Sequence, residues 1–348
     1  MLGTDTTLDS VAPPTAREVE VAASLSAGRQ RVLLGVYTAA VFVSAFLLFL
    51  VQPMFSKMVL PMLGGTPAVW NTCMLFFQAA LLGGYLYAHL GPRWLGVRRH
   101  SAIHLALLAA AFLALPIALP GTAPTTDEAP VLWLLGALAL SLGLPFFAVS
   151  ASGPLLQKWF SETGHRDAHN PYFLYAASNA GSLLALLSYP ALVEPRLRLA
   201  DQSLWWTGGY VTLFALFCAC ALLLRLAPAP AGALAAGGVT GGFDTASAAS
   251  PVATHAEATA PTLRDRAAWV LYSLVPSSLL LGVTAYLTTD VAAVPLLWIV
   301  PLALYLLTFI FVFARRQVLP HGLLVNLAPF LAVPILLGIS LGATGPGN

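Results

Sequence analysis

The sequence predicts an all-α, polytopic membrane protein with about nine transmembrane helices. Of its 348 residues, 58% are hydrophobic and only 9% are charged, and the mean hydropathy is +0.82. A soluble domain carries about 25% charged residues, so a soluble fold of this composition could not cover its own core. Apolar stretches of about 20 residues recur along the chain, and a helix of this length crosses ~30 Å of hydrocarbon. The composition therefore excludes an ordinary soluble enzyme and a disordered or fibrous chain.

Polar segments before and between the apolar stretches divide the chain into four parts. Residues 1–31 contain no apolar run, which predicts a disordered cytoplasmic tail and no signal peptide. Residues 227–266 are rich in Ala, Gly, Pro, Thr and Ser and predict a disordered cytoplasmic linker. This linker separates a six-helix half, residues 32–226, from a three-helix segment, residues 267–348. The predicted spans are 32–52, 68–90, 101–120, 131–150, 172–192, 205–226, 269–289, 293–314 and 321–342.

The basic residues predict how the helices are oriented. When the N-terminus is placed in the cytoplasm and the spans alternate, only Lys57, Arg196 and Arg198 of the 16 Lys and Arg residues lie outside. Cytoplasmic loops of membrane proteins carry an excess of Lys and Arg. We therefore expect a multi-pass protein of the cell (inner or plasma) membrane with a cytoplasmic N-terminus. The lipid bilayer is its expected partner, and a net charge of +2 is too small to indicate nucleic acid.

Four amide side chains fall within or beside predicted spans. They are Gln52, Asn71, Gln78 and Asn179. Such groups form hydrogen bonds between packed membrane helices, and the alternative is that they line a polar cavity for a solute. Asn179 belongs to the sequence Ser-Asn-Ala-Gly-Ser, whose small residues favour close helix packing.

Three ionisable residues lie at predicted outer helix ends. An ionisable group within a span costs roughly 2.5–3.5 kcal/mol on insertion scales, which makes it a functional candidate. Lys57 and Asp290 occupy matching positions in a short stretch of sequence similarity between the two parts of the chain. They either extend to the interface or form an ion pair that gates the outer mouth. Glu194 can pair with a neighbouring arginine or take part in proton coupling.

Three long stretches carry a family resemblance. They read LVQPMFSKMVLPMLGGTPAVWNTCMLFFQ (50–78), YFLYAASNAGSLLALLSYPALVEPRL (172–197) and VPSSLLLGVTAYLTTDVAAVPLLWIVPLALYLLTFIFVF (275–313). They resemble the membrane domain of the fused major-facilitator/spermidine-synthase family. The resemblance implies a transporter-like bundle of the major-facilitator type, here incomplete and arranged as six plus three helices. It also implies a soluble aminopropyltransferase-like domain, for which this chain has no soluble stretch of sufficient length.

The loop GPRWLGVRRH (91–100) resembles the basic cytoplasmic loop of major-facilitator proteins. Arg93, Gly96, Arg98 and Arg99 match its basic and glycine positions, whereas the Asp expected before Arg93 is Pro92. The alternative interpretation is a simple positive anchor at the cytoplasmic face.

Two functions follow from these patterns. The first is a transporter-like protein that moves a small solute, such as a polyamine. The second is a non-catalytic membrane anchor or scaffold for a separately encoded spermidine-synthase-like enzyme. The sequence contains no clustered metal ligands and no legible catalytic arrangement, so we expect neither an enzyme nor a bound cofactor.

Overall fold

The structure is a computed structural model that describes residues 16–119 except 65, 130–163, 173–227, 262–286 and 299–313, with isolated positions in 165–171 and 322–337. Every regular element in these ranges is a helix. Within the described residues, six continuous helical stretches are long and apolar enough to cross a membrane. The all-helical membrane class predicted from composition is therefore confirmed. The count of nine spans and their arrangement as six plus three stay predictions.

Helix α1 (Ala16–Leu63) is the central element of the bundle. It packs against α5 (Leu144–Ser161), α6 (Phe173–Ser188) and α8 (Leu199–Arg225). Its fully buried side chains include Tyr37, Val51 and Phe55. The apolar run is therefore more than a lipid-facing surface, because part of it forms the core between neighbouring helices.

The predicted tail differs from the structure, because α1 begins at Ala16 and continues through residues 17–31. This segment contains mainly Ala, Arg, Glu and Val, residues that favour or tolerate a helix, and it contains no proline. Residues 1–15 lie outside the described residues, as does most of the predicted linker, residues 228–261.

Helices α2 (Pro67–Leu95) and α3 (Val97–Ala110) are joined by a single residue, Gly96. Its φ of 73° lies in the region that glycine adopts without steric cost, so the chain can reverse direction there. A short 3₁₀ segment (Ala111–Ala114) extends α3, and the helix then ends before Pro116. The span predicted over 101–120 is thus helical only as far as Ala114.

Two spans contain a π-helical segment beside a proline. Helix α4 (Pro130–Leu138) continues through a π segment (Ala139–Gly143) into α5, just before Pro145. Helix α6 continues through a π segment (Tyr189–Val193), which contains Pro190, into α7 (Glu194–Arg196). Proline lacks the N–H that an α-helical hydrogen bond needs, and its ring clashes with the carbonyl group of the residue four positions earlier. These two prolines account for the local change of helical pitch.

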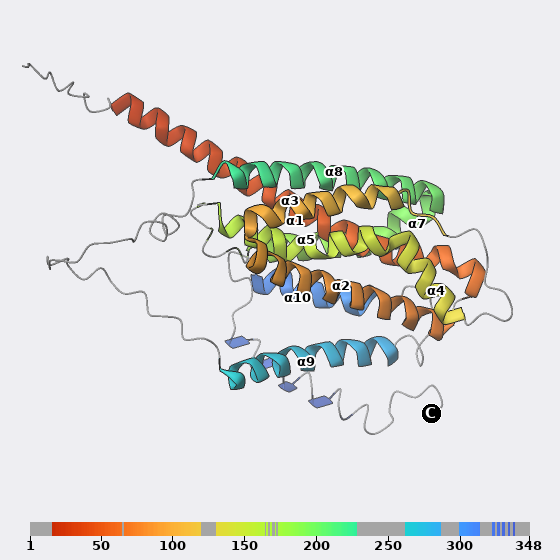
Figure 1. Ribbon diagram of the computed structural model, residues 1–348. Coiled ribbons are helices and arrows are strands. Elements are labelled where there is room, and N and C mark those ends of the chain that lie inside the picture. Colours follow the sequence, from red (N-terminus) through yellow and green to blue (C-terminus); the bar gives the residue numbers. More distant parts are fainter. Residues whose placement is uncertain are drawn as a thin grey trace, which may run out of the picture.

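The chain beyond the linker contributes α9 (Leu263–Tyr286) and α10 (Ile299–Phe313). Ile299 and Leu306 of α10 pack on Leu186 of α6. Helix α9 begins with a capping box, in which the Thr262 N–H donates to the Asp265 carboxylate at 2.9 Å. The most apolar stretch of α9 is not buried against the rest of the described structure, and Figure 1 shows α9 apart from the bundle. Much of the predicted span 321–342 lies outside the described residues.

Candidate functional site

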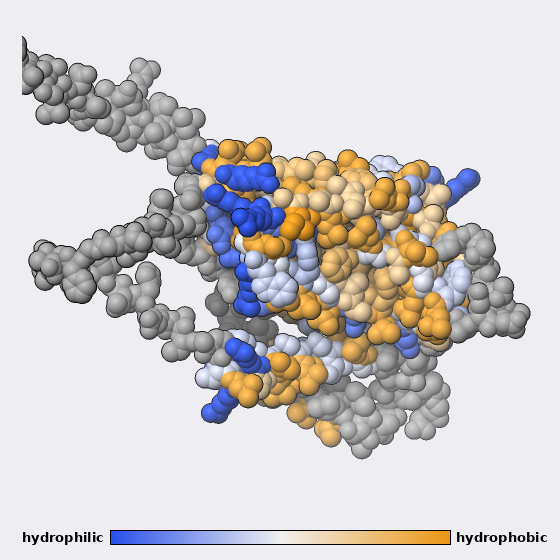
Figure 2. All heavy atoms as spheres, in the orientation of Figure 1, coloured by the Kyte–Doolittle hydropathy of each residue, from blue (hydrophilic) through white to orange (hydrophobic). Residues whose placement is uncertain are grey.

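Basic residues from distant parts of the sequence meet at one end of the bundle, which we call the basic end. The Arg29 guanidinium donates to the Leu226 carbonyl oxygen at 2.8 Å. The Arg98 guanidinium donates to the Ala227 carbonyl oxygen at 3.2 Å. Hydrophilic residues gather at this same end of the molecule in Figure 2. This clustering agrees with the predicted face rich in Lys and Arg. That the basic end faces the cytoplasm stays a prediction.

A cavity of about 1110 Å³ opens at the basic end between α2, α3 and α5. The loop residues singled out in the sequence, Arg93, Gly96, Arg98 and Arg99, all lie in its wall. Arg93 comes from the last turn of α2, and the other two arginines come from the first turn of α3. The positive end of the α3 dipole adds to their charge. We call this space the basic cavity.

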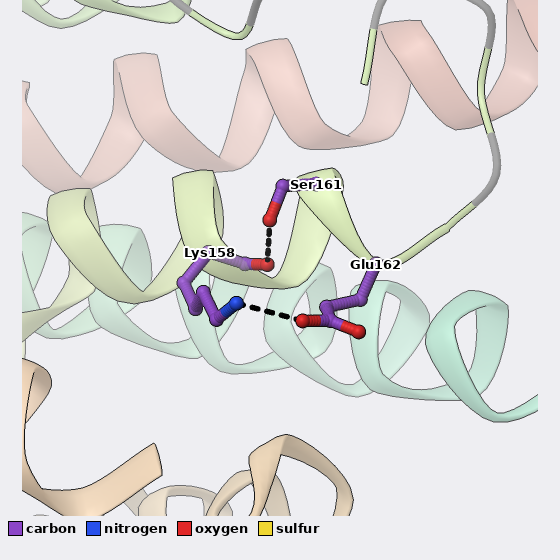
Figure 3. Close-up of polar contacts among 3 residues, drawn as sticks. All are labelled: Lys158, Ser161 and Glu162. Carbon is purple, nitrogen blue, oxygen red and sulfur yellow. Dashed lines mark hydrogen bonds and ion pairs between the residues drawn. The ribbon is translucent and has the colours of Figure 1, made fainter. Parts of the chain in front are cut away.

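Helix α5 supplies the remaining charges of the basic cavity. Lys158 donates to the Glu162 carboxylate at 2.7 Å, and the Ser161 hydroxyl donates to the Lys158 carbonyl oxygen at 2.8 Å (Figure 3). Among the described residues of the wall, the one acid, Glu162, is therefore already paired with the one lysine. Within the described part of the chain the three arginines have no acidic partner. The cavity is suited to an anion.

A cluster of buried aromatic and imidazole rings lies beside the basic cavity. Tyr87 packs on His100 with a centroid distance of 4.6 Å, and His104 lies 6.3 Å from Trp159. The Tyr87 hydroxyl, the Trp159 N–H and both nitrogens of each imidazole are buried without a hydrogen-bond partner in the described structure. His104 is not among the candidate residues predicted from the sequence. Within the described residues, no group of three or more His, Cys, Asp or Glu can hold a metal ion.

We expect the variant His104→Phe to be at least as stable as the native chain. A phenyl ring has nearly the same shape and removes two buried polar atoms that lack partners, and such a replacement is neutral or stabilising. The measurement is the thermal unfolding midpoint in detergent, with His89→Phe as control because His89 is exposed. A clear fall in the midpoint for His104→Phe alone would contradict the expectation.

An ion pair lies near the opposite end of α1. The Lys57 ammonium and the Glu194 carboxylate are 2.5 Å apart, and their side chains are 22% and 32% exposed. The carboxylate thus pairs with α1 and not with Arg196 or Arg198. Arg196 instead donates to the Ala191 carbonyl oxygen at 3.0 Å. Asp290, the alternative partner of Lys57, lies outside the described residues.

We expect Lys57→Glu and Glu194→Lys, made singly, each to lower the free energy of unfolding by about 1 kcal/mol or more, because each places like charges together in a partly buried site. The double variant should recover most of the loss, since it restores an ion pair of reversed polarity. Chemical unfolding in micelles provides the measurement. Breaking the exposed Lys158–Glu162 pair is the matched control and should cost below about 0.5 kcal/mol. If the double variant lost as much free energy of unfolding as the two single variants together, the ion pair would contribute no coupling energy.

The four predicted amides do not meet at one site. The Gln52 amide donates to the Leu48 carbonyl oxygen at 3.2 Å, and the Asn179 amide donates to the Tyr175 carbonyl oxygen at 2.8 Å. Both bonds stay within the residue's own helix. Asn71 and Gln78 are exposed on α2. None of the four lines the basic cavity.

Close packing at the Ser-Asn-Ala-Gly-Ser sequence comes from its glycine. Gly181 is buried, and a Cβ atom there would overlap the Phe42 carbonyl oxygen of α1.

No family model matches the chain, and neither does any curated protein or solved structure.

Proposed function

We propose that this integral membrane protein is transporter-like and that its basic cavity receives a small anionic solute. The observation that carries the proposal is the cavity of about 1110 Å³ whose wall contains Arg93, Arg98 and Arg99 without acidic partners among the described residues. Sites for small molecules commonly measure about 300–1,000 Å³ and use a few charged groups for orientation. Guanidinium groups bind carboxylates and phosphates through paired hydrogen bonds.

The charge of the cavity bears on the class of solute. A polyamine, the solute suggested by the family resemblance, is a polycation and would be repelled by three arginines and the α3 dipole. A carboxylate or phosphate would instead be attracted. Membership of the fused major-facilitator/spermidine-synthase family, and the bundle of six plus three helices, are part of this proposal and rest on the sequence motifs.

The test is uptake into proteoliposomes that contain the purified full-length chain. Labelled inorganic phosphate, succinate and spermidine should be compared with vesicles that lack protein. Accumulation of either anion above the empty vesicles, without accumulation of spermidine, is the expected result. Uptake of spermidine alone would overturn the choice of an anion. No uptake of any of the three would count against the transport of phosphate, simple dicarboxylates and polyamines.

A scaffold role is the second candidate, and the exposure of α9 favours it. None of the apolar window of α9 is buried, and Trp269, Val270 and Tyr272 are all more than half exposed. Such a helix can pack against helices of another protein as well as against lipid. Purification from native membranes should then recover a spermidine-synthase-like enzyme with the native chain and much less with Trp269→Ala/Tyr272→Ala. Equal recovery with both forms would exclude α9 as the contact.

A further inference from the structure

A second cavity lies toward the end of the bundle that holds the Lys57–Glu194 pair. It measures about 670 Å³ and lies between α1, the π segment after α6, and α8. Its wall is largely apolar, with Leu47, Leu50 and Met54 contributed by α1. Leu204 and Trp205, at its rim, are 58% and 72% exposed. This apolar groove therefore opens to the lipid-facing side of the bundle, away from the basic cavity.

Two polar atoms in the groove wall have no hydrogen-bond partner among the residues that the structure describes. They are the Tyr189 hydroxyl and the Gln202 amide oxygen, which belong to residues that are 0% and 3% exposed. Two other polar groups of the wall have partners. The Gln202 amide nitrogen donates to the Leu197 carbonyl oxygen, and the Trp206 N–H donates to the Leu47 carbonyl oxygen, each at 2.9 Å. The residues that line the groove thus include one buried hydroxyl donor and one buried amide acceptor without partners.

Neighbouring glycines of α8 give the groove its shape. At Gly209 a Cβ atom would lie 2.7 Å from the Leu47 side chain, so α1 and α8 touch there. At Gly208 a Cβ atom would meet nothing within 4 Å. Gly208 therefore borders open space beside a tightly packed helix contact. Tyr189 and Gln202 line the same cavity as these two glycines.

We propose that the apolar groove binds one membrane glycerolipid that keeps a free glycerol hydroxyl, such as a monoacyl- or diacylglycerol. The hydrocarbon chain of the lipid would lie along the leucines of α1. There it would contact a shaped apolar wall in place of water or loosely packed lipid. An ester carbonyl of the lipid would accept from the Tyr189 hydroxyl, and a glycerol hydroxyl would donate to the Gln202 amide oxygen. Leaving a buried donor or acceptor unpaired costs about 1–3 kcal/mol, so a ligand that satisfies both gains specificity over a plain hydrocarbon.

The experiment uses the full-length chain in detergent and monoolein with a photoreactive diazirine in its acyl chain. Monoolein carries both an ester carbonyl and free hydroxyls. After irradiation, peptide mass spectrometry should find the label concentrated in residues 47–54 and 202–212. Unlabelled monoolein should compete, whereas hexadecane should not.

Two variants test the groove itself, each with a matched control. Tyr189→Phe should reduce labelling about fivefold, the effect of one hydrogen bond. Tyr210→Phe should not, because the Tyr210 hydroxyl donates to the Leu108 carbonyl oxygen at 2.9 Å, outside the groove. Gly208→Leu should abolish labelling by filling the groove. Gly153→Leu should not, since Gly153 also borders open space but does not line the groove. Size-exclusion chromatography confirms that each variant is folded.

Three results would overturn the proposal. One is label spread evenly over exposed apolar positions such as Leu132 and Leu222, which would indicate annular lipid only. Another is competition by hexadecane equal to that of monoolein, which would remove the role of the polar pair. The third is unchanged labelling in a folded Gly208→Leu variant, which would place the lipid elsewhere.

Discussion

Replacing Gly181 by alanine is expected to lower the free energy of unfolding by about 3 kcal/mol or more. The added Cβ atom would overlap the Phe42 carbonyl oxygen and crowd the Phe46 backbone nitrogen. Both neighbours are backbone atoms of α1, so no side-chain rotation can relieve the contact, and α1 and α6 must move apart. Small residues let membrane helices approach this closely, and separation loses the dispersion contacts of the whole interface.

Thermal and chemical unfolding in detergent should measure this loss. The matched control is Gly153→Ala, because a Cβ atom at Gly153 meets nothing within 4 Å and alanine favours the helix. Gly181→Ala should therefore lose stability while Gly153→Ala keeps or gains it. Equal stability of the two variants would mean that α1 and α6 do not touch at Gly181.

The second large effect is expected in anion binding, and it rests on the proposed function. Replacing Arg93, Arg98 and Arg99 together by glutamine should weaken binding of inorganic phosphate or succinate by more than about 100-fold. Each charge-assisted hydrogen bond contributes roughly 1.5–3 kcal/mol. The loss of three such bonds therefore weakens binding by more than about 100-fold even when one of them is weak. The three side chains are exposed, so their removal should change the stability by little.

Isothermal titration of the purified chain should measure that change in affinity. Arg225→Gln is the matched control, since Arg225 lies in the last turn of α8 but does not line the basic cavity. It removes one positive charge near the same end of the bundle without removing a wall residue. If Arg225→Gln weakened binding as much as the triple variant, the effect would reflect general surface charge and not a site.

Hydropathy predicted the membrane class because length and apolar content suffice to identify a span. It predicted less of what lies inside the bundle, because core-facing and lipid-facing positions are both apolar in a membrane. Tyr189 was not selected for this reason, although it is buried. Gln202 was missed because the predicted span begins at residue 205, whereas α8 begins at Leu199. Both residues line a cavity whose other wall comes from α1, which is distant in sequence. The tail boundary was also missed, since residues 16–31 are polar enough to suggest a loop yet form a helix.

The candidate site was predictable where its residues are close in sequence. Arg93, Gly96, Arg98 and Arg99 come from one short loop, so a motif of ten residues found them together. Lys158 joins them only through the packing of α5 on α2 and α3, which no local pattern reveals. The Lys57–Glu194 pair likewise joins α1 to the start of α7. For Glu194 the sequence suggested the nearest arginines, because it contains no information on distance across the bundle.

The contact at Gly181 also limits how this bundle can change shape. Two helices whose backbones touch cannot slide or rotate past each other without first separating, so α1 and the first part of α6 should move as one rigid body. The π segment that contains Pro190 follows directly after α6 and has the wider π-helical hydrogen bonding in place of the α-helical pattern. It is therefore the nearest hinge, and bending there would swing Tyr189 and Glu194 relative to α1. The apolar groove and the ion pair would then open or close in a single motion.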